Sequence, residues 1–257
     1  MAAGRVILSL LSMFFMAGAI LLIFLTLLGG ANNASPLNRI WFLQVNTGNI
    51  PGAPAVSRWT FWNICRVDNH GHSRCGSSHP AYPLDPPSHR NFHTKTNIPH
   101  QFIGTNHYFL MTRFMFAFIL IGLFFAVLSF FLGLLALCTR IGAFLASLMG
   151  WIAWVFQVIT TSLMTAAYVK ARDHFNHNGQ RARIGAKAFG FMWAAVACML
   201  LSNILYCIGA IAGRRREGYT GRETRRRGFF GPRRNASARS RGSFANDMGA
   251  SRKESYA

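Results

Sequence analysis

The hydrophobic pattern of the chain is dominated by four long apolar runs that contain no Asp, Glu, Lys or Arg. They cover residues 6–28, 114–137, 141–169 and 188–212. About 20 helical residues cross the hydrocarbon core of a bilayer, so each run is long enough to span it. A soluble protein would need four helices that are apolar on every side, with no face for water. The pattern predicts an all-α membrane protein with a four-transmembrane-helix bundle.

The runs divide the chain into membrane and aqueous segments. The first run is longer than the roughly 7 to 15 apolar residues of a cleaved signal peptide, which favours an uncleaved anchor. Small residues at 29–31 would permit cleavage, so a signal peptide is the alternative. In chain order the predicted segments are the N-terminus and first span (1–28), the first loop (29–113), the second span (114–137), a short turn (138–140), the third span (141–169), the second loop (170–187), the fourth span (188–212) and a tail (213–257).

The distribution of charge orients these spans. Residues 214–257 hold 13 Lys or Arg and 4 Asp or Glu, a net charge of +9, whereas the first 213 residues carry a net charge of +11. Because cytoplasmic segments are enriched in Lys and Arg, we expect the tail in the cytoplasm, and four spans return the N-terminus to the same side. Both loops are then extracellular. Five basic residues of the second loop oppose this orientation: Lys170, Arg172, Arg181, Arg183 and Lys187.

The first loop contains the elements of a small sheet. The segments RIWFLQV and WTFWNIC are rich in aromatic and β-branched residues, and the turn-forming NTGNIPGAP separates them. Cys65 and Cys75 lie in this loop, where an oxidising compartment would allow a disulfide, and Asp68 and Gly71 between them favour a hairpin turn. We therefore expect a small disulfide-stapled extracellular β-sheet. Asn33 begins an Asn-Ala-Ser sequon and is a candidate glycosylation site.

The fourth span carries a stripe of small residues. Small side chains on one helical face let a neighbouring helix approach closely in lipid. We expect this stripe to hold the four helices together, with a homodimer interface as the alternative. Its members are Ala186, Gly190, Ala194, Cys198 and Ser202, followed by the GxxxG pair Gly209 and Gly213.

Catalytic and transport chemistry are disfavoured by the spans. They contain no ionisable residue of the kind that marks proton relays or ion pathways, and the chain has no HExxH, GxSxG or phosphate-loop motif. The sequence predicts neither enzymatic activity nor a cofactor or metal. A polar cluster is expected to form interhelical hydrogen bonds rather than a conduction path: Gln157, Thr160, Thr161, Ser162 and Asn203.

The tail is dominated by Arg, Gly and Ser without apolar periodicity, so we expect it to be disordered. Arginines near an anionic inner leaflet favour lipid binding. Nucleic-acid binding is disfavoured because the tail lacks regularly spaced aromatic residues on which bases could stack. The basic positions are Arg214, Arg215, Arg216, Arg225, Arg226, Arg227, Arg233 and Arg234. Phosphorylation of neighbouring serines would weaken this attraction, and the candidates are Ser237, Ser240 and Ser243.

Several motifs resemble known tetraspans. Trp62, Cys65 and Cys75 match the W-x-x-C…C signature of the claudin-like superfamily, with Trp41 or Trp59 as the upstream tryptophan, although the usual Gly-Leu before the signature is absent. A closer resemblance, to the fungal Sur-seven/PalI family, lies between residues 10 and 209. It is carried by AYPLDPPSHRNFH, QFIGTNHYFLMTRFMFAF, LGLLALCTRIG and LMTAAYV.

This resemblance implies a four-helix bundle topped by a small claudin-like sheet, in cortical patches of the plasma membrane associated with eisosomes. It implies roles in cell-wall organisation, endocytosis and membrane-domain stability. The expected partners are eisosome proteins, anionic inner-leaflet lipid with sphingolipid as a further candidate, and other copies in a homo-oligomer or lateral assembly. The PalI branch implies ambient-pH signalling. That alternative would use the first loop, where seven of the nine histidines lie.

Overall fold

The computed structural model describes residues 2–138 and 140–229, with side chains described for residues 7–135 and 142–209. Its helices are α1 (Ala2–Leu27), α2 (His107–Cys138), α3 (Arg140–His177) and α4 (Ala186–Phe229), with short 3-10 turns η1 (Leu37–Arg39) and η2 (His100–Phe102). All four α-helices are long and apolar enough to cross a membrane. The predicted four-span architecture is confirmed.

The helices are apolar on their outer faces as well as their inner ones. Phe14, Phe124 and Phe144 expose 60% or more of their surface, while Ala153 and Ala195 are fully buried between helices. Large apolar side chains on the outside are unfavourable in water and favourable against lipid tails, whereas small residues inside let the backbones approach closely. The side-chain distribution is that of a bundle within a bilayer.

Several helices extend beyond the apolar runs that predicted them. α2 begins at His107, and α3 continues to His177, so the polar residues 170–177 are helical rather than part of a loop. α4 continues to Phe229, past the end of the predicted span at residue 212. Arg and Glu are good helix formers, and extending an existing helix needs no new nucleus. An apolar run thus marks the membrane-crossing part of a helix but not where the helix ends.

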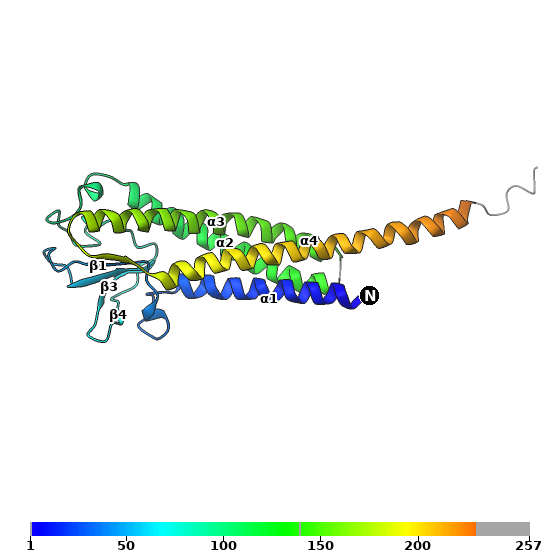
Figure 1. Cartoon of the computed structure of the whole chain (residues 1–257), viewed down its shortest axis with the longest axis horizontal. Helices are drawn as coiled ribbons and strands as arrows, with labels where there is room; N and C mark the ends of the chain where they lie inside the picture. Colours follow the sequence, from blue (N-terminus) through cyan, green and yellow to red (C-terminus); the bar gives the residue numbers. More distant parts are fainter. Residues whose placement is uncertain (1, 139, 230–257) are drawn as a thin grey trace, which may run out of the picture. The chain divides into compact units, whose positions relative to one another are not determined.

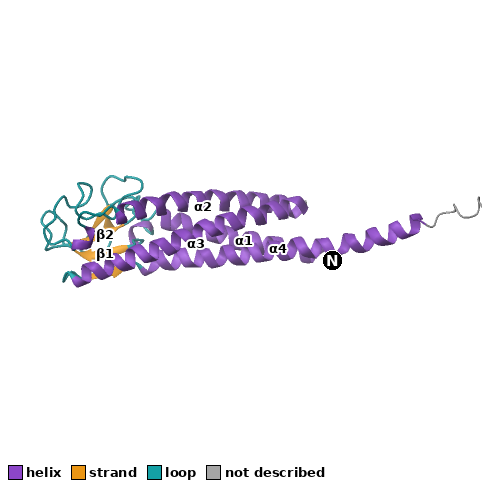
Figure 2. Ribbon diagram, turned by 90° about the horizontal axis from the view of Figure 1, so that it is seen from above, coloured by secondary structure: helices purple, strands orange, loops and turns teal. Residues whose placement is uncertain are grey.

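A five-stranded antiparallel sheet lies at one end of the bundle (Figure 1). Its strands are β1 (Leu43–Asn46), β2 (Val56–Trp59), β3 (Ile64–Val67), β4 (Ser73–Arg74) and β5 (Ala182–Ile184), in the spatial order β4-β3-β2-β1-β5. The first loop supplies four of these strands, and the predicted small sheet is confirmed. The fifth comes from the second connection, where Ile184 lies opposite Leu43 on β1. Figure 2 shows these strands and the long loops gathered at the same end.

An aromatic seam joins the sheet to α3. Trp59 on β2 is fully buried, and its ring centroid lies 5.9 Å from that of Phe175 near the end of α3. Phe42, next to β1, stacks on Tyr168 of α3 at 5.2 Å and meets Phe61 edge-on at 4.5 Å. Buried aromatic pairs at these distances add a directional attraction to the area that they bury. The sheet and α3 therefore share one core.

Candidate functional site: the disulfide-closed sheet

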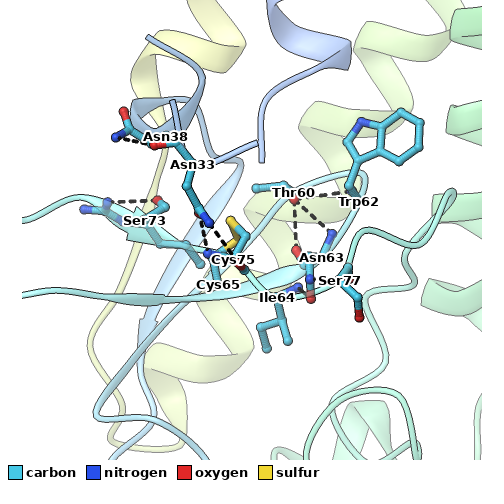
Figure 3. Close-up of a disulfide and its surroundings, with 11 residues drawn as sticks. Asn33, Asn38, Thr60, Trp62, Asn63, Ile64, Cys65, Ser73, Cys75 and Ser77 are labelled. Atoms are coloured by element: carbon cyan, nitrogen blue, oxygen red, sulfur yellow. Dashed lines mark hydrogen bonds between the residues drawn. A yellow bond between two sulfur atoms is a disulfide. The ribbon is translucent and has the colours of Figure 1, made fainter. Parts of the chain in front are cut away.

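The hairpin β3–β4 is closed by a disulfide between Cys65 and Cys75, which confirms the predicted pairing (Figure 3). Gly71 takes a positive φ of 74° in the turn, a conformation that favours glycine. The Asp68 carboxylate accepts backbone N–H bonds from His70 at 3.0 Å and His72 at 2.8 Å. The turn is thus held at its tip by Asp68 and at its base by the disulfide.

Asn33 fastens the hairpin to the segment that follows α1. Its side-chain amide donates to the Cys75 carbonyl at 3.1 Å, and its side-chain oxygen accepts from the Cys75 N–H at 2.8 Å (Figure 3). This reciprocal pair resembles one step of a β-ladder. The sequence indicated only a sequon at Asn33, and glycosylation there stays a prediction. The contact was not predictable because it joins residues 42 positions apart.

The three signature tryptophans have different environments. Trp62 donates its indole N–H to the carbonyl of Leu27 at 2.6 Å, which satisfies one of the unpaired carbonyls at the end of α1. Trp59 lies in the aromatic seam and donates to Asn91 at 3.1 Å. Trp41 is only half-buried, and the Arg58 guanidinium carbon lies 4.9 Å from its ring centroid. The signature therefore ties the sheet to the membrane helices on one side and to the long loop on the other.

Lowering the pH is expected to loosen the hairpin turn. The hydrogen bond from the His72 N–H lowers the pKa of Asp68, and bonds from Arg74 and the His70 N–H act in the same direction. A carboxylate whose pKa falls on folding stabilises the fold above its unfolded pKa of about 3.9, and this stabilisation is lost as the pH falls through the folded pKa. The protection factor of the His72 amide against hydrogen exchange should therefore decrease below about pH 4.

The matched variant is Asp68→Asn, which we expect to weaken this protection already at neutral pH and to remove its acid dependence. A local measurement is required because burial raises the pKa of Asp85, which shifts global stability with pH in the opposite direction. Protection of His72 that is identical in the two proteins at every pH would contradict this role for Asp68.

The histidines are spread over the surface rather than gathered into one site. His89 and His93 form the closest pair, with ring centroids 4.0 Å apart, and both side chains are exposed. His174 and His177 lie in the last turn of α3, not in a loop as expected. The described residues contain no group of three or more His, Cys, Asp or Glu arranged to hold a metal ion.

An open cavity of about 660 Å³ lies beside the base of the hairpin. Arg90 from the long loop and Arg113 from α2 line it, together with Tyr82, whose pKa is raised by burial. The Arg113 guanidinium carbon lies 4.9 Å from the Phe109 ring centroid. Arg90 and Arg113 each belong to a segment that carries the family resemblance, AYPLDPPSHRNFH and QFIGTNHYFLMTRFMFAF. The sequence did not indicate that the two arginines share a cavity, because only the fold brings these segments together.

The first half of the small-residue stripe of α4 faces away from the bundle. Ala186, Gly190 and Ala194 are exposed, and a Cβ atom at Gly190 would meet no heavy atom within 4 Å. The prediction that they hold the bundle together is wrong for these three residues. Among the other members Cys198 is half-buried, Ser202 and Gly209 are buried, and the side-chain position of Gly213 lies outside the described residues. Sequence spacing identified the stripe but not the direction in which it points.

The polar cluster also differs from expectation. Thr160 and Thr161 donate to backbone carbonyls one turn earlier in α3, and Ser162 is exposed. Gln157 does reach α4, where it donates to the sulfur of Met192 at 3.5 Å, whereas neither polar atom of the Asn203 side chain has a hydrogen-bond partner among the described residues. Threonines satisfy their hydroxyls on their own helix because this needs no matching group on a neighbour.

Further interhelical polar contacts come from serines. Ser12 of α1 donates to the Ser202 carbonyl at 2.6 Å, and Ser202 donates back to the Ser12 carbonyl at 2.8 Å. Ser129 of α2 donates to the Ala146 carbonyl of α3 at 2.7 Å.

The side chains of the predicted lipid-binding arginines lie outside the described side chains, although the backbone of residues 214–227 continues α4. Arg233, Arg234, Ser237, Ser240 and Ser243 lie outside the described residues altogether. Lipid binding and phosphorylation of the tail stay predictions.

Together these features define a class: a multi-pass membrane protein in which four spanning helices support a disulfide-closed antiparallel sheet. A model of the SUR7/PalI family matches residues 8–205. Protein SUR7 of Candida albicans is 39% identical over 210 residues, which cover 81% of this chain and 76% of the relative. Protein SUR7 of Saccharomyces cerevisiae is 34% identical over 218 residues, which cover 84% of this chain and 72% of the relative.

A further relative, an uncharacterized plasma membrane protein of Saccharomyces cerevisiae, is 32% identical over 213 residues, which cover 81% of this chain and 70% of the relative. The chain belongs to the SUR7/PalI family. The resemblance noted in the sequence is therefore confirmed.

Proposed function

We propose that the protein is a non-enzymatic organiser of the plasma membrane that assembles laterally into eisosome-associated cortical patches. In this role it supports cell-wall organisation, endocytosis and the stability of membrane domains. The observation that carries the proposal is the exposed small-residue face of α4, formed by Ala186, Gly190 and Ala194. Such a face leaves room for the backbone of another helix, which is how helices associate in lipid.

The proposed orientation places both termini in the cytoplasm and the sheet outside the cell, where a disulfide persists. The sheet then presents a surface to neighbouring proteins or wall polymers. The basic tail would bind anionic inner-leaflet lipid, each arginine near the surface contributing about 1 kcal/mol. The relative that is described as a plasma membrane protein supports the proposed location in the plasma membrane.

A second candidate function is ambient-pH sensing. The observation in its favour is the pair His89 and His93, because protonation of both rings would place two positive charges about 4.0 Å apart. Both side chains are exposed to solvent, which screens that repulsion, so the organiser role is the better supported of the two.

The test is imaging of the full chain, tagged after Ala257, in a fungal host that lacks its own copy. We expect stable cortical patches for the wild type and dispersed signal for Ala194→Leu, since a leucine on the exposed face would hold a neighbouring helix away. Overpacking of this kind costs about 1–3 kcal/mol, a shift of roughly 5- to 150-fold in association.

The matched control is Ala117→Leu, which makes the same change at an exposed alanine on α2 and should leave the patches intact. Dispersal by both variants would instead indicate general damage to the bundle. A diffuse wild-type signal, with loss of growth at alkaline pH when the protein is deleted, would replace the organiser role by the sensor.

A further inference from the structure

A second cavity, of about 490 Å³, lies where the sheet meets the start of α4. Its volume falls within the roughly 300–1,000 Å³ typical of small-molecule sites. Its lining is strongly basic and includes Arg39, Trp41, Arg58, His70, His72 and Lys187. None of the described residues that line it is a carboxylate, so three permanent positive charges face one space.

Arg58 is the group in this cavity that most requires a partner. It is 8% exposed, and its guanidinium donates to Gln44 at 2.9 Å, to the Gly71 carbonyl at 2.9 Å and to Ser73 at 3.1 Å. All three acceptors are neutral. Within the part of the chain that the structure describes, Arg58 forms no ion pair, and its Nη2 atom donates no hydrogen bond. A buried cation without an anionic partner is costly, and a bound anion would offset that cost.

The neighbouring carboxylate does not supply the missing charge. The charge of Asp68 reaches Arg58, but the Asp68 oxygens are bonded to two backbone N–H groups and to Arg74 at 3.2 Å. Burial lowers the pKa of Arg58, and the charge of Asp68 opposes this only in part. The Nδ1 atom of His72 is also buried and has no hydrogen-bond partner in the described part of the chain.

The corner between β5 and α4 brings Lys187 into the cavity, while Arg39 comes from η1. Gly185 donates its N–H to the Phe42 carbonyl at 2.9 Å, and a Cβ atom at Gly185 would collide with the backbone of Trp41. This close approach holds Trp41 next to Lys187 in the first turn of α4. The side chains of Arg39 and Lys187 make no hydrogen bond or ion pair to the other described residues, so both are free to bind a ligand.

The position of the cavity indicates where its anion comes from. Its wall includes Ala186, where the membrane-crossing part of α4 begins, and Ile40, next to Arg39, lies against Gly29 just after α1. The cavity therefore opens at the level of lipid headgroups. A zwitterionic choline headgroup would bring its own cation towards three others, which disfavours it.

We propose that this cavity binds the phosphate of an anionic phospholipid headgroup, held by Arg39, Arg58 and Lys187. Lys187 is one of the five basic residues of the second loop that oppose the assigned orientation. In this site it binds the ligand, which explains a basic residue on the extracellular side. Phosphate is the shared chemistry of a lipid headgroup and a soluble phosphate ester, and the experiment separates these two sources.

The test is native mass spectrometry of the full chain in detergent with equimolar phosphatidylinositol and phosphatidylcholine, and in a separate arm with glycerol 3-phosphate. High salt is used because it screens exposed charges, including the tail, more than a partly buried site. We expect one phosphatidylinositol retained per chain, with affinity reduced about tenfold or more in the double variant Arg39→Gln and Lys187→Gln, since charged hydrogen bonds are lost.

The control double variant, Lys95→Gln and Arg181→Gln, removes the same charge from exposed positions outside the cavity and should bind within about twofold of the wild type. Thermal unfolding without ligand should be alike in all three proteins. Suppose that only glycerol 3-phosphate binds more weakly to the Arg39 and Lys187 double variant than to the control. The cavity is then a phosphate site, but its ligand is a soluble phosphate ester and not a lipid. Equal losses in both double variants, or no preference for either phosphate ligand, would overturn the proposal.

Discussion

Replacing Cys65 with serine is expected to unfold the hairpin and its surroundings without preventing membrane insertion. A disulfide that closes a loop of this size stabilises the fold by roughly 3 kcal/mol in the chain-entropy model. Strand β4 has only two residues, so little else holds it against β3. Insertion depends on the four apolar helices, which the disulfide does not touch. Hydrogen exchange should show lost protection in β3 and β4 and unchanged protection in α2 and α3.

The double variant Cys65→Ser and Cys75→Ser is the control, and it should be no worse than the single one because one bond is lost in both cases. In patches imaged as above, both variants should reach the plasma membrane but fail to assemble. Labelling of Cys65 or Cys75 in the wild-type protein on intact cells by an impermeant maleimide would contradict the extracellular disulfide.

Trp59→Ala is expected to have the larger effect, because it removes the centre of the aromatic seam. Trp59 is fully buried, and its ring lies 5.8 Å from Phe92 and 5.9 Å from Phe175, so it joins the long loop and α3 to the sheet. Replacing a buried Trp by Ala costs about 3–5 kcal/mol. We expect the sheet to unfold at a clearly lower temperature, as monitored by the fluorescence of the remaining tryptophans and by hydrogen exchange.

Trp59→Phe is the matched control. It keeps an aromatic ring in the seam but removes the indole N–H that donates to Asn91 at 3.1 Å. The lost hydrogen bond alone is expected to cost about 1 kcal/mol, with some further cost for the smaller ring. If the two variants were equally stable, the ring contacts would not be what joins the sheet to α3.

The sequence by itself determined the membrane architecture and the disulfide hairpin. Four charge-free runs identify four spans because a lipid environment requires apolar residues all around a helix. This requirement is local, so a window of about 20 residues is enough to recognise a span. Cys65 and Cys75 are close along the chain and flank a turn, so their pairing is a local property as well. Family motifs then indicated the sheet on top of the bundle.

The tertiary structure alone decided which distant residues meet. Ile184 pairs with Leu43, Asn33 binds Cys75 and Trp62 caps the end of α1, and none of these contacts leaves a periodic signal in the chain. The direction of the α4 stripe was also decided there, since four-residue spacing places small residues on one face without saying what that face meets. The cluster of Arg39, Arg58 and Lys187 has the same origin: three basic residues from separate segments share one cavity because antiparallel pairing brings β5 beside β1.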